Sequence, residues 1–450
     1  MANLVDWLLK QVVSVREGEI RALFLSFAYF FCVLCSYYIL RPVRDEMGIQ
    51  GGVENLHWLF TGTFVAMLVA VPVFAAAAAR LPRGRLLPWA YGFFIVNLLI
   101  FFALFHSDIA TTHVARAFFI WVSVFNLFVV SVFWSFMADL FRNEQARRLF
   151  GFIAAGGSAG AIIGPALTGI LATRFGPVNL LLLSAFVLLL AVWCIHQLNR
   201  WAAKRAGRSY SVAKQTAEHG TADAPATAPL GGSVLSGVKR VFRSPYLLGI
   251  CLYIWLHTTL ATFLYFEQAH IVAEAFVDSG QRTALFAYMD LSVNALTVFG
   301  QLFLVARIVR RFGLALTLAV VPALVALGFL VLAVSPVLAV LVVFQVLRRA
   351  GNFAIARPAR EMLFTVLARE EKYKSKNFID TVVYRGGDAA SAWAFAGLTA
   401  LGLGLSAIAF VAVPLAIGWV LTGLWLGRKQ ERLDPAAGAE GVRLHASSLP

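Results

Sequence analysis

The stretch that decides the fold runs from Gln345 to Asp388 and reads QVLRRAGNFAIARPAREMLFTVLAREEKYKSKNFIDTVVYRGGD. Apolar runs flank it on both sides, yet Arg348 and Arg349 interrupt the first run, and Arg385 and Asp388 interrupt the second. Charged groups inside a membrane span are costly and by default indicate a functional site. The other interpretation is that these groups pair with one another and hold two helices together. Both interpretations place the flanking runs in a membrane.

The rest of the chain supports a membrane protein. It has 450 residues, of which 60% are hydrophobic, and a mean hydropathy of +0.78. Apolar windows of about 20 residues are typical of helices that cross a bilayer. The sequence predicts twelve such spans, at 20–41, 56–79, 87–106, 114–138, 149–173, 178–197, 246–267, 283–305, 313–334, 337–358, 377–402 and 405–427.

A polar segment divides these spans six and six. Residues 198–245 include AKQTAEHGTADAPATAPLGG, which is rich in Ala, Thr, Gly and Pro and is typical of a disordered linker. Arg80 and Arg307, Glu144 and Glu371, and Gly160 and Gly387 recur at one common offset, which favours two like-oriented halves. We therefore expect an all-α membrane protein of two pseudo-symmetric six-helix bundles. Its parts are an amphipathic cytoplasmic segment (1–19), the first bundle (20–197), a cytoplasmic linker (198–245), the second bundle (246–427) and a cytoplasmic tail (428–450).

The positive charge indicates topology and not nucleic-acid binding. The net charge is +15, and most Lys and Arg residues lie in the loops that follow every second span. The opposite turns carry few, namely Arg41, Arg44, Arg116, Arg174 and Arg282. Because basic residues gather in cytoplasmic loops, both termini and the linker are predicted to be cytoplasmic and the Ser335–Pro336 turn to be outside.

The charged groups of the deciding stretch are predicted to lie at the depth where a carrier holds its substrate. At 1.5 Å per residue, Arg348 and Arg349 lie about 16–18 Å into their span, and Arg385 and Asp388 about 12–17 Å into theirs. A hydrocarbon core is about 30 Å thick, so all four are near its middle. Since consecutive residues point about 100° apart, one of the two neighbouring arginines should face the cavity. The other should pair or pack, with Asp388 or Asp290 as candidate partners. The predicted substrate-binding residues are Arg385 first, then Arg348, Arg349, Asp388, Asp290, Asn294, Arg44 and Asn126.

A second group of charged residues is a candidate for gates. Some lie at the predicted cytoplasmic ends of spans and are expected to pair across the two bundles, the alternative being solvated interfacial charge. Two others lie near outer ends. The predicted gating residues are Asp139, Arg147, Arg148, Arg360, Glu361 and Asp380 inside, and Asp45 and Glu267 outside. Gly156, Gly160 and Gly164 recur every four residues and predict close helix packing.

No enzyme signature is present in the sequence: there is no H-E-x-x-H, no G-x-S-x-G and no clustered set of metal ligands. We therefore expect no enzyme activity, no metal and no cofactor. The expected partners are a small anionic substrate and the lipid bilayer, with protons as an alternative coupling ion, and no nucleic acid.

Three places resemble the ATP:ADP antiporter family of nucleotide transporters, which has the major-facilitator type of fold. YYILRPVRDEM in the first span is similar to the family's N-Y-x-I-L-R-x-x-K-D, with Arg44 in place of Lys. FWSFMADLFRNEQARRLFGFIAAGGSAGAIIGP is similar to its F-W-x-F-x-N segment, with Ala138–Asp139 in place of the Asn–acid pair. AREMLFTVLAREEKYKSKNFIDTVVYRGGD is similar to its T-K-E-M, K-x-K-x-x-I-D and R-x-G segments. The matching positions here are Arg360, Glu361, Met362, Lys374, Asp380, Arg385 and Gly387.

The resemblance implies a secondary transporter in a bacterial inner membrane that exchanges nucleotides of the ATP and ADP type. Arginines at substrate depth agree with an anionic, phosphorylated substrate, because the guanidinium binds phosphate through two hydrogen bonds and stays charged. Two alternatives remain open. One is a proton-coupled exporter of another organic solute, with Asp290 or Asp388 as the proton carrier. The other is a membrane scaffold that does not transport.

Overall fold

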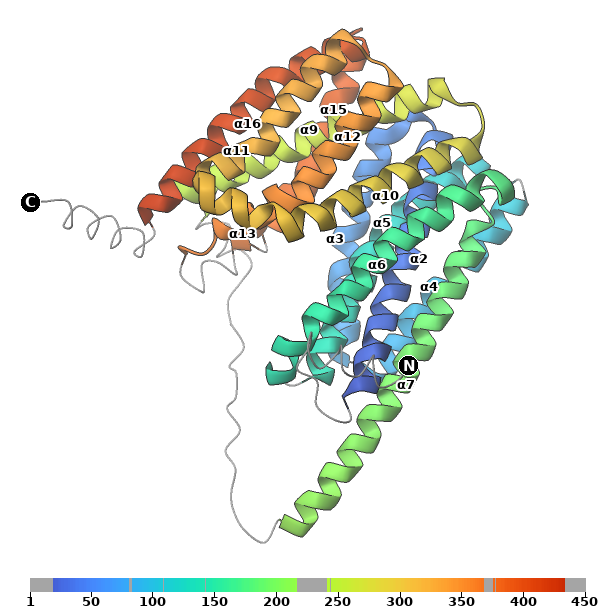
Figure 1. The fold of residues 1–450 in the computed structure, drawn as a ribbon. Helices are drawn as coiled ribbons and strands as arrows, with labels where there is room; N and C mark the ends of the chain where they lie inside the picture. The colour runs from blue at the N-terminus through green and yellow to red at the C-terminus, as the bar shows by residue number, and fades with distance from the viewer. Residues whose placement is uncertain are drawn as a thin grey trace, which may run out of the picture. The chain divides into compact units, whose positions relative to one another are not determined.

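The computed structural model describes residues 19–80, 83–107, 109–141, 143–216, 241–242, 244–367, 375–376 and 378–433. The predicted amphipathic segment, apart from its last residue, lies outside this range, as do most of the linker and the end of the tail. The described chain is helical throughout (Figure 1). Its long helices are α2 (Ile20–Gln50), α3 (Leu56–Arg80), α4 (Arg83–His106), α5 (Thr111–Leu140), α6 (Asn143–Phe175), α7 (Leu180–Thr216), α9 (Pro245–Ala275), α10 (Ser279–Phe303), α11 (Val305–Val334), α12 (Leu338–Gly351), α15 (Tyr384–Ala400) and α16 (Leu405–Leu433).

Shorter helical segments complete the chain. They are the 3₁₀ turn η1 (Val53–Asn55), the π-helices η2 (Asn352–Ala356) and η3 (Ile379–Val383), and α13 (Arg357–Met362). Within the described residues, 11 helices are long and apolar enough to cross a membrane. The span predicted at 377–402 corresponds to η3 and α15, where the π-helix leaves an α-helix of 17 residues. The prediction of an all-α membrane protein is confirmed.

Several helices extend beyond their predicted ends, α2 and α7 the farthest. The first span was expected to end near residue 41, but α2 continues to Gln50 with Pro42 inside it. A proline removes one backbone hydrogen bond, and a membrane helix tolerates this where neighbouring groups satisfy the freed carbonyl. The sixth span was expected to end at 197, whereas α7 continues to Thr216, so the first part of the predicted linker is helical. Residues 217–240 of the linker lie outside the described residues.

The chain packs into two compact units. The first comprises residues 1–52, 65–227 and 276–291, and in it α5, α6 and α7 pack around α2 (Figure 1). The second comprises residues 53–64, 228–275 and 292–450, and its most extensive packing is between α11 and α16, with α15 and α16 against α9. The first part of α10 therefore packs with the first unit and its remainder with the second.

Glycines account for the close approach of α6 to α2. A Cβ atom added to Gly156, Gly160 or Gly164 would lie less than 3.0 Å from the backbone oxygen of Phe27, Phe31 or Cys35. The predicted four-residue glycine stripe is thus a packing surface, because a face without side chains lets two helix backbones come together.

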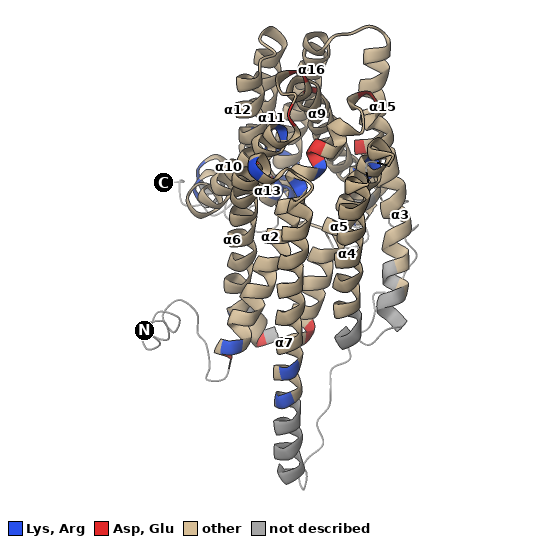
Figure 2. Cartoon of the chain, turned by 90° about the vertical axis from the view of Figure 1, so that its right-hand side faces the viewer, with Lys and Arg blue, Asp and Glu red and all other residues tan. Residues whose placement is uncertain are grey.

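Charged residues are few along the described helices. Figure 2 shows long tan stretches of helix with the blue and red residues in small groups. Charged side chains in the interior of such an apolar protein require partners, because burying an unpaired charge is costly. The interior charged groups are therefore the candidates for functional sites in this fold.

Candidate functional site

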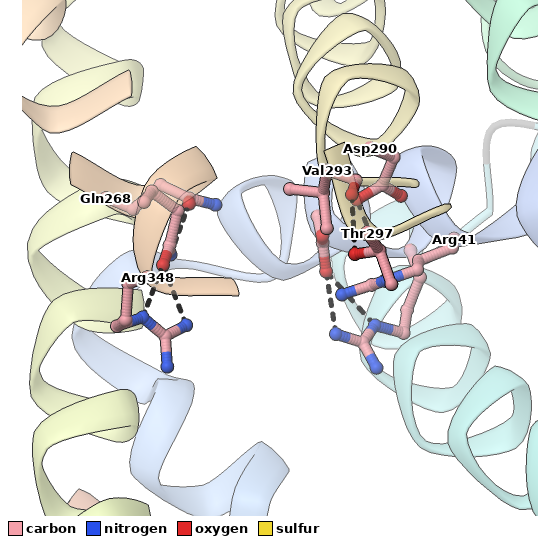
Figure 3. Close-up of polar contacts among 9 residues, drawn as sticks. Arg41, Gln268, Asp290, Val293, Thr297 and Arg348 are labelled. Atoms are coloured by element: carbon pink, nitrogen blue, oxygen red, sulfur yellow. Dashed lines mark hydrogen bonds and ion pairs between the residues drawn. The ribbon is translucent and has the colours of Figure 1, made fainter. Parts of the chain in front are cut away.

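The two consecutive arginines of the deciding stretch are buried in the second unit. Arg348 and Arg349 lie in the last turn of α12 and are each 9% exposed. Arg348 Nε and Nη2 both donate to Gln345 Oε1, at 2.9 and 2.7 Å. Gln345 Nε2 in turn donates to Gln268 Oε1 on α9, at 2.7 Å. Figure 3 shows this chain of side chains from Arg348 to Gln268. The two buried amides fix the orientation of the guanidinium, since two hydrogen bonds from one of its edges prevent it from rotating.

The backbone departs from α-helical geometry at two places in this stretch. The π-helix η2 directly follows α12, which carries Arg348, and the π-helix η3 directly precedes α15, which carries Arg385. π-Helical turns are rare and occur frequently at functional sites, where the extra residue reorients the side chains that follow. Pro358 follows η2 by two residues and cannot donate a hydrogen bond to the Ala354 oxygen within it, whereas no proline lies in or near η3.

Arg385 and Asp388 form an ion pair along one face of α15. The Nη1 to Oδ2 distance is 3.5 Å, and the side chains are 36% and 19% exposed. A Cβ atom at Gly387 would lie 2.5 Å from Thr258 Oγ1, so the glycine lets α15 approach α9 beside this pair. The sequence predicted that Asp388 or Asp290 would pair with one of the consecutive arginines. The structure instead gives Asp388 the partner Arg385, because residues three apart on a helix are neighbours.

Asp290 lies beside an arginine of α2. Its Oδ1 lies 3.6 Å from Arg41 Nη1 of α2, and the carboxylate is 1% exposed (Figure 3). Asn294, one turn along α10, is buried as well, at 8% exposed. Both polar side chains therefore lie against other parts of the protein and not on its outer surface. The sequence placed Arg41 only among the few basic residues of the predicted outer turns, because its partner is some 250 positions away in the chain.

The charged end of the first span is interior and helical. Arg44 Nε and Nη2 donate to Asp45 Oδ1 at 3.1 and 2.7 Å, its guanidinium carbon lies 4.8 Å from the Phe119 ring centre, and Nη1 lies 3.4 Å from Ser123 Oγ. Asn126 is half-buried three residues after Ser123, on α5. Asp45, a predicted outer gating residue, is only 7% exposed, so these contacts lie inside the protein.

The predicted inner gating residues fall in both units. In the first, Arg148 lies 3.4 Å from Glu19, which also accepts a 2.5 Å hydrogen bond from Gln145, and Asp139 is exposed. The side chain of Arg147 lies outside the described residues.

In the second unit, Lys376 Nζ lies 2.5 Å from Glu361 Oε2. Arg360 and Lys376 both lie close enough to Asp380 for their charges to attract its carboxylate. Arg148 in the first unit and Glu361 in the second thus contact residues that the sequence did not single out, Glu19 and Lys376.

Glu267, a predicted outer gating residue, has an unusual environment. It lies on α9 and is 1% exposed, and neither carboxylate oxygen accepts a hydrogen bond from any part of the chain that the structure describes. A buried carboxylate without a bonding partner costs several times more free energy than a buried amide. The residue therefore does not stabilise the fold in this conformation.

This environment leads to a prediction. Glu267→Gln is expected to leave the midpoint of thermal unfolding unchanged or to raise it, because the amide has the same shape and is less costly to bury. The measurement is thermal unfolding of the purified protein in detergent. Glu46→Gln is the comparison variant and should lower the midpoint, since Glu46 is 0% exposed and has an arginine partner. Equal losses in the two variants would show that Glu267 has a stabilising partner.

Known proteins resemble this chain in sequence and in fold. The protein named "ADP,ATP carrier protein 1" of Chlamydia muridarum (strain MoPn / Nigg) is 23% identical, over 94% of this chain and 90% of that protein. The crystal structure of the POT family transporter PepTSo superimposes with a TM-score of 0.63 at 13% identity, over 92% of this chain and 99% of that one. An auto-inhibited POT family peptide transporter has a TM-score of 0.60 at 14% identity, over 92% and 97%. At these identities the two structures establish the fold alone.

A family profile covers most of the chain. The profile described as Major Facilitator Superfamily matches residues 22–373, which include most of the first unit, part of the second and the deciding stretch as far as residue 373. Members of this superfamily and the transporters of similar fold share the two-bundle architecture that the sequence predicts. This chain belongs to the Major Facilitator Superfamily: it is an integral membrane protein built as a secondary transporter and not as an enzyme.

Proposed function

We propose that the protein exchanges small anionic, phosphorylated molecules across the membrane, with nucleotides of the ATP and ADP type as the first candidates. The observation that carries the proposal is the buried guanidinium of Arg348 on α12. It is held by the amide of Gln345, which is itself bonded to the amide of Gln268 on α9. An arginine stays charged at any working pH and offers a planar fork that fits a phosphate group. The relative named as an ADP,ATP carrier supports the nucleotide class.

Several cationic groups serve the same site in this proposal. Arg348, Arg349 and Arg385 would bind the anionic groups, Asp388, Asp290 and Asn294 would orient the cations and the substrate, and Arg44 and Asn126 would line the side of the first unit. The two bundles of the proposal span residues 20–197 and 246–427. An anionic substrate relieves the repulsion between buried cations, so the loaded carrier should reorient more readily than the empty one. A carrier that reorients mainly when it is loaded returns with a second substrate bound, and so exchanges one substrate for another.

Closure on the inner side belongs to the same proposal. Asp139, Arg147 and Arg148 on one side and Arg360, Glu361 and Asp380 on the other are charged residues at helix ends. Contacts between them would close the cytoplasmic entrance in one state and separate in the other, as switching contacts do. Exposed pairs contribute only about 0–1 kcal/mol each, which suits a contact that must open in every cycle.

Reconstituted protein provides the test. Proteoliposomes loaded with unlabelled nucleotide should take up labelled nucleotide, and empty proteoliposomes should not, because exchange needs a counter-substrate. The same vesicles are then screened with organophosphates and with a pH gradient. Uptake that follows the pH gradient and needs no internal substrate would replace exchange by proton coupling. Absence of transport for every member of the panel in folded protein would favour a scaffold.

A topological prediction accompanies this function. A reporter fused after Arg240, which lies outside the described residues, is expected to be active on the cytoplasmic side of a bacterial inner membrane, because the Lys and Arg residues gather in that set of loops. The same reporter inserted in the Ser335–Pro336 turn is the matched control and should be active outside. The opposite result for both fusions would invert the topology and make both termini external.

A further inference from the structure

Glu267 is a buried acid for which the described part of the fold provides no partner. It lies on α9 and is 1% exposed. Neither carboxylate oxygen accepts a hydrogen bond from the described residues, and none of these residues forms an ion pair with it. On one side of it, the centre of the Phe266 ring lies 5.0 Å from that of Phe395. On the other side, Gln268 accepts a hydrogen bond from Gln345 at 2.7 Å. Glu267 is thus enclosed in a packed part of the second unit.

The other titratable groups nearby do not compensate this carboxyl group. On α9 itself, His270 has its Nδ1 2.8 Å from the Phe266 oxygen, and Glu274 is exposed. Among the helices packed against α9, α16 carries no charged residue before Arg428. The remaining charged or titratable groups form no hydrogen bond or ion pair with Glu267, namely Tyr265 on α9, Glu54 on η1, His57 on α3, Arg348 and Arg349 on α12, Asp380 on η3, and Tyr384, Arg385 and Asp388 on α15. Burial therefore dominates the environment of Glu267, and no nearby charge offsets it.

Protonation lowers the cost of this environment. A charged carboxylate in an apolar interior, without donors or a counter-charge, costs far more free energy than the neutral acid, so such a group takes up a proton. A metal ion would need several ligands, and the described residues contain no group of three His, Cys, Asp or Glu side chains that could supply them. A single carboxyl group is sufficient to bind a proton.

The position of Glu267 along α9 decides from which side of the membrane the proton comes. Glu267 lies eight residues before the end of α9 at Ala275, which is about 12 Å at 1.5 Å per residue. The distribution of basic residues predicts that this end of α9 faces outside. A carrier with two bundles opens to one side of the membrane and then to the other. Water from outside can therefore approach the outer half of α9 in one state and is excluded from it in the other.

We propose that Glu267 is a proton-binding site of the transport cycle. Its carboxyl group holds a proton in this conformation, releases it to the outside when water reaches the outer half of α9, and takes a proton up again before that half closes. A ligand that binds one conformation more tightly than another shifts the equilibrium between them, and here the ligand is the proton. External acid therefore favours the closed conformation and external alkali the open one. The proposal adds a proton to the proposed exchange, and it rests on alternating access and not on the identity of the substrate.

The first measurement asks whether Glu267 carries a proton. The infrared C=O stretching band of neutral carboxyl groups is recorded for purified protein in lipid vesicles at about pH 7, where an ordinary glutamate with a pKa of about 4.3 is ionised. Glu267→Gln should lower the band by the contribution of one carboxyl group per chain. Glu274→Gln is the matched control, because Glu274 is an exposed glutamate on the same helix, and it should leave the band unchanged. Equal bands in the two variants would show that Glu267 is ionised and would overturn the site.

The second measurement asks whether the proton is linked to opening. A cysteine replaces Ile271, which is 6% exposed and lies one turn after Glu267, in a chain whose four cysteines are replaced. Its reaction rate with a membrane-impermeant thiol reagent added outside is measured over a range of external pH. Each rate is divided by the rate of the same chain with Glu267→Gln, which cancels the titration of the thiol itself. The ratio should rise with pH, by at most about tenfold per pH unit for one proton. The Glu274→Gln chain, compared in the same way, should show the same rise.

Each remaining outcome counts against the proposal. A ratio that does not change with pH would make Glu267 a permanently neutral residue, even if the infrared band is lost. If Glu267→Gln does not fold, Glu267→Met, which is uncharged and of similar length, takes its place. Failure of both variants to fold would show that Glu267 stabilises this conformation through a partner. No nucleotide enters either measurement, so these failures would leave the proposed exchange standing, and failed nucleotide exchange would leave the proton site standing.

Discussion

Arg348→Gln is expected to weaken the binding of an anionic substrate by about 2–5 kcal/mol, the cost of truncating one partner of a buried, hydrogen-bonded charge pair. This corresponds to a loss of about 30-fold to several thousand-fold in apparent affinity. The reason is the site of the guanidinium: it is 9% exposed, and Gln345 holds it through two hydrogen bonds. A phosphate that reaches it meets a charge already oriented and poorly screened by water.

The measurement is the concentration dependence of exchange in proteoliposomes. The apparent affinity of Arg348→Lys should fall between that of the unchanged chain and that of Arg348→Gln, because lysine keeps the charge but loses the planar fork. Arg357→Gln is the matched control, since Arg357 is an exposed arginine nine residues along the same stretch. Equal affinities for the Arg348 and Arg357 variants in folded, membrane-inserted protein would rule out Arg348 as an anion-binding residue.

Arg385, the residue ranked first from the sequence, is tested in the same assay against its ion-pair partner. Arg385→Gln leaves Asp388 without the arginine that lies 3.5 Å away. The double variant Arg385→Gln with Asp388→Asn removes both charges. If the pair is structural, the double variant should recover the affinity that the single variant loses. If Arg385 contacts the substrate, affinity should stay low in both.

Gly160→Leu is expected to prevent the accumulation of folded protein, the second large effect. The Cβ atom alone would lie less than 3.0 Å from the Phe31 oxygen and the Cys35 nitrogen on α2, both of them backbone atoms that cannot move aside. Overpacking of a core costs about 1–3 kcal/mol even when side chains can adjust, and here two backbones must separate. The smaller change Gly160→Ala should still lower the midpoint of thermal unfolding.

The same helix provides the control for this prediction. Gly151 lies on α6 and is exposed, with nothing within 4 Å of an added Cβ atom. Gly151→Leu should therefore yield folded protein with a midpoint close to that of the unchanged chain. The measurements are the yield of monodisperse protein in detergent and its thermal unfolding. Similar yields for the Gly160 and Gly151 variants would mean that α2 and α6 are not held by this glycine surface.

The sequence by itself determined the class and order of the elements. Runs of about 20 apolar residues are sufficient to predict membrane helices, because no other structure satisfies the backbone in lipid at that length. The glycine spacing of α6 likewise predicted its packing, since a repeat of four places residues on one helix face.

Only the tertiary structure decided which charges meet. Arg41 pairs with Asp290, and Glu46 with Arg282, across more than 230 positions of sequence, while Glu267 accepts no hydrogen bond from the described residues. Periodicity says which face of a helix is polar, but the partner depends on how distant helices pack and on the rotation of each about its axis. The continuation of α2 beyond Pro42 depends on that packing as well, because Asp45 and Glu46 are buried against other helices and their charges would otherwise have ended the span.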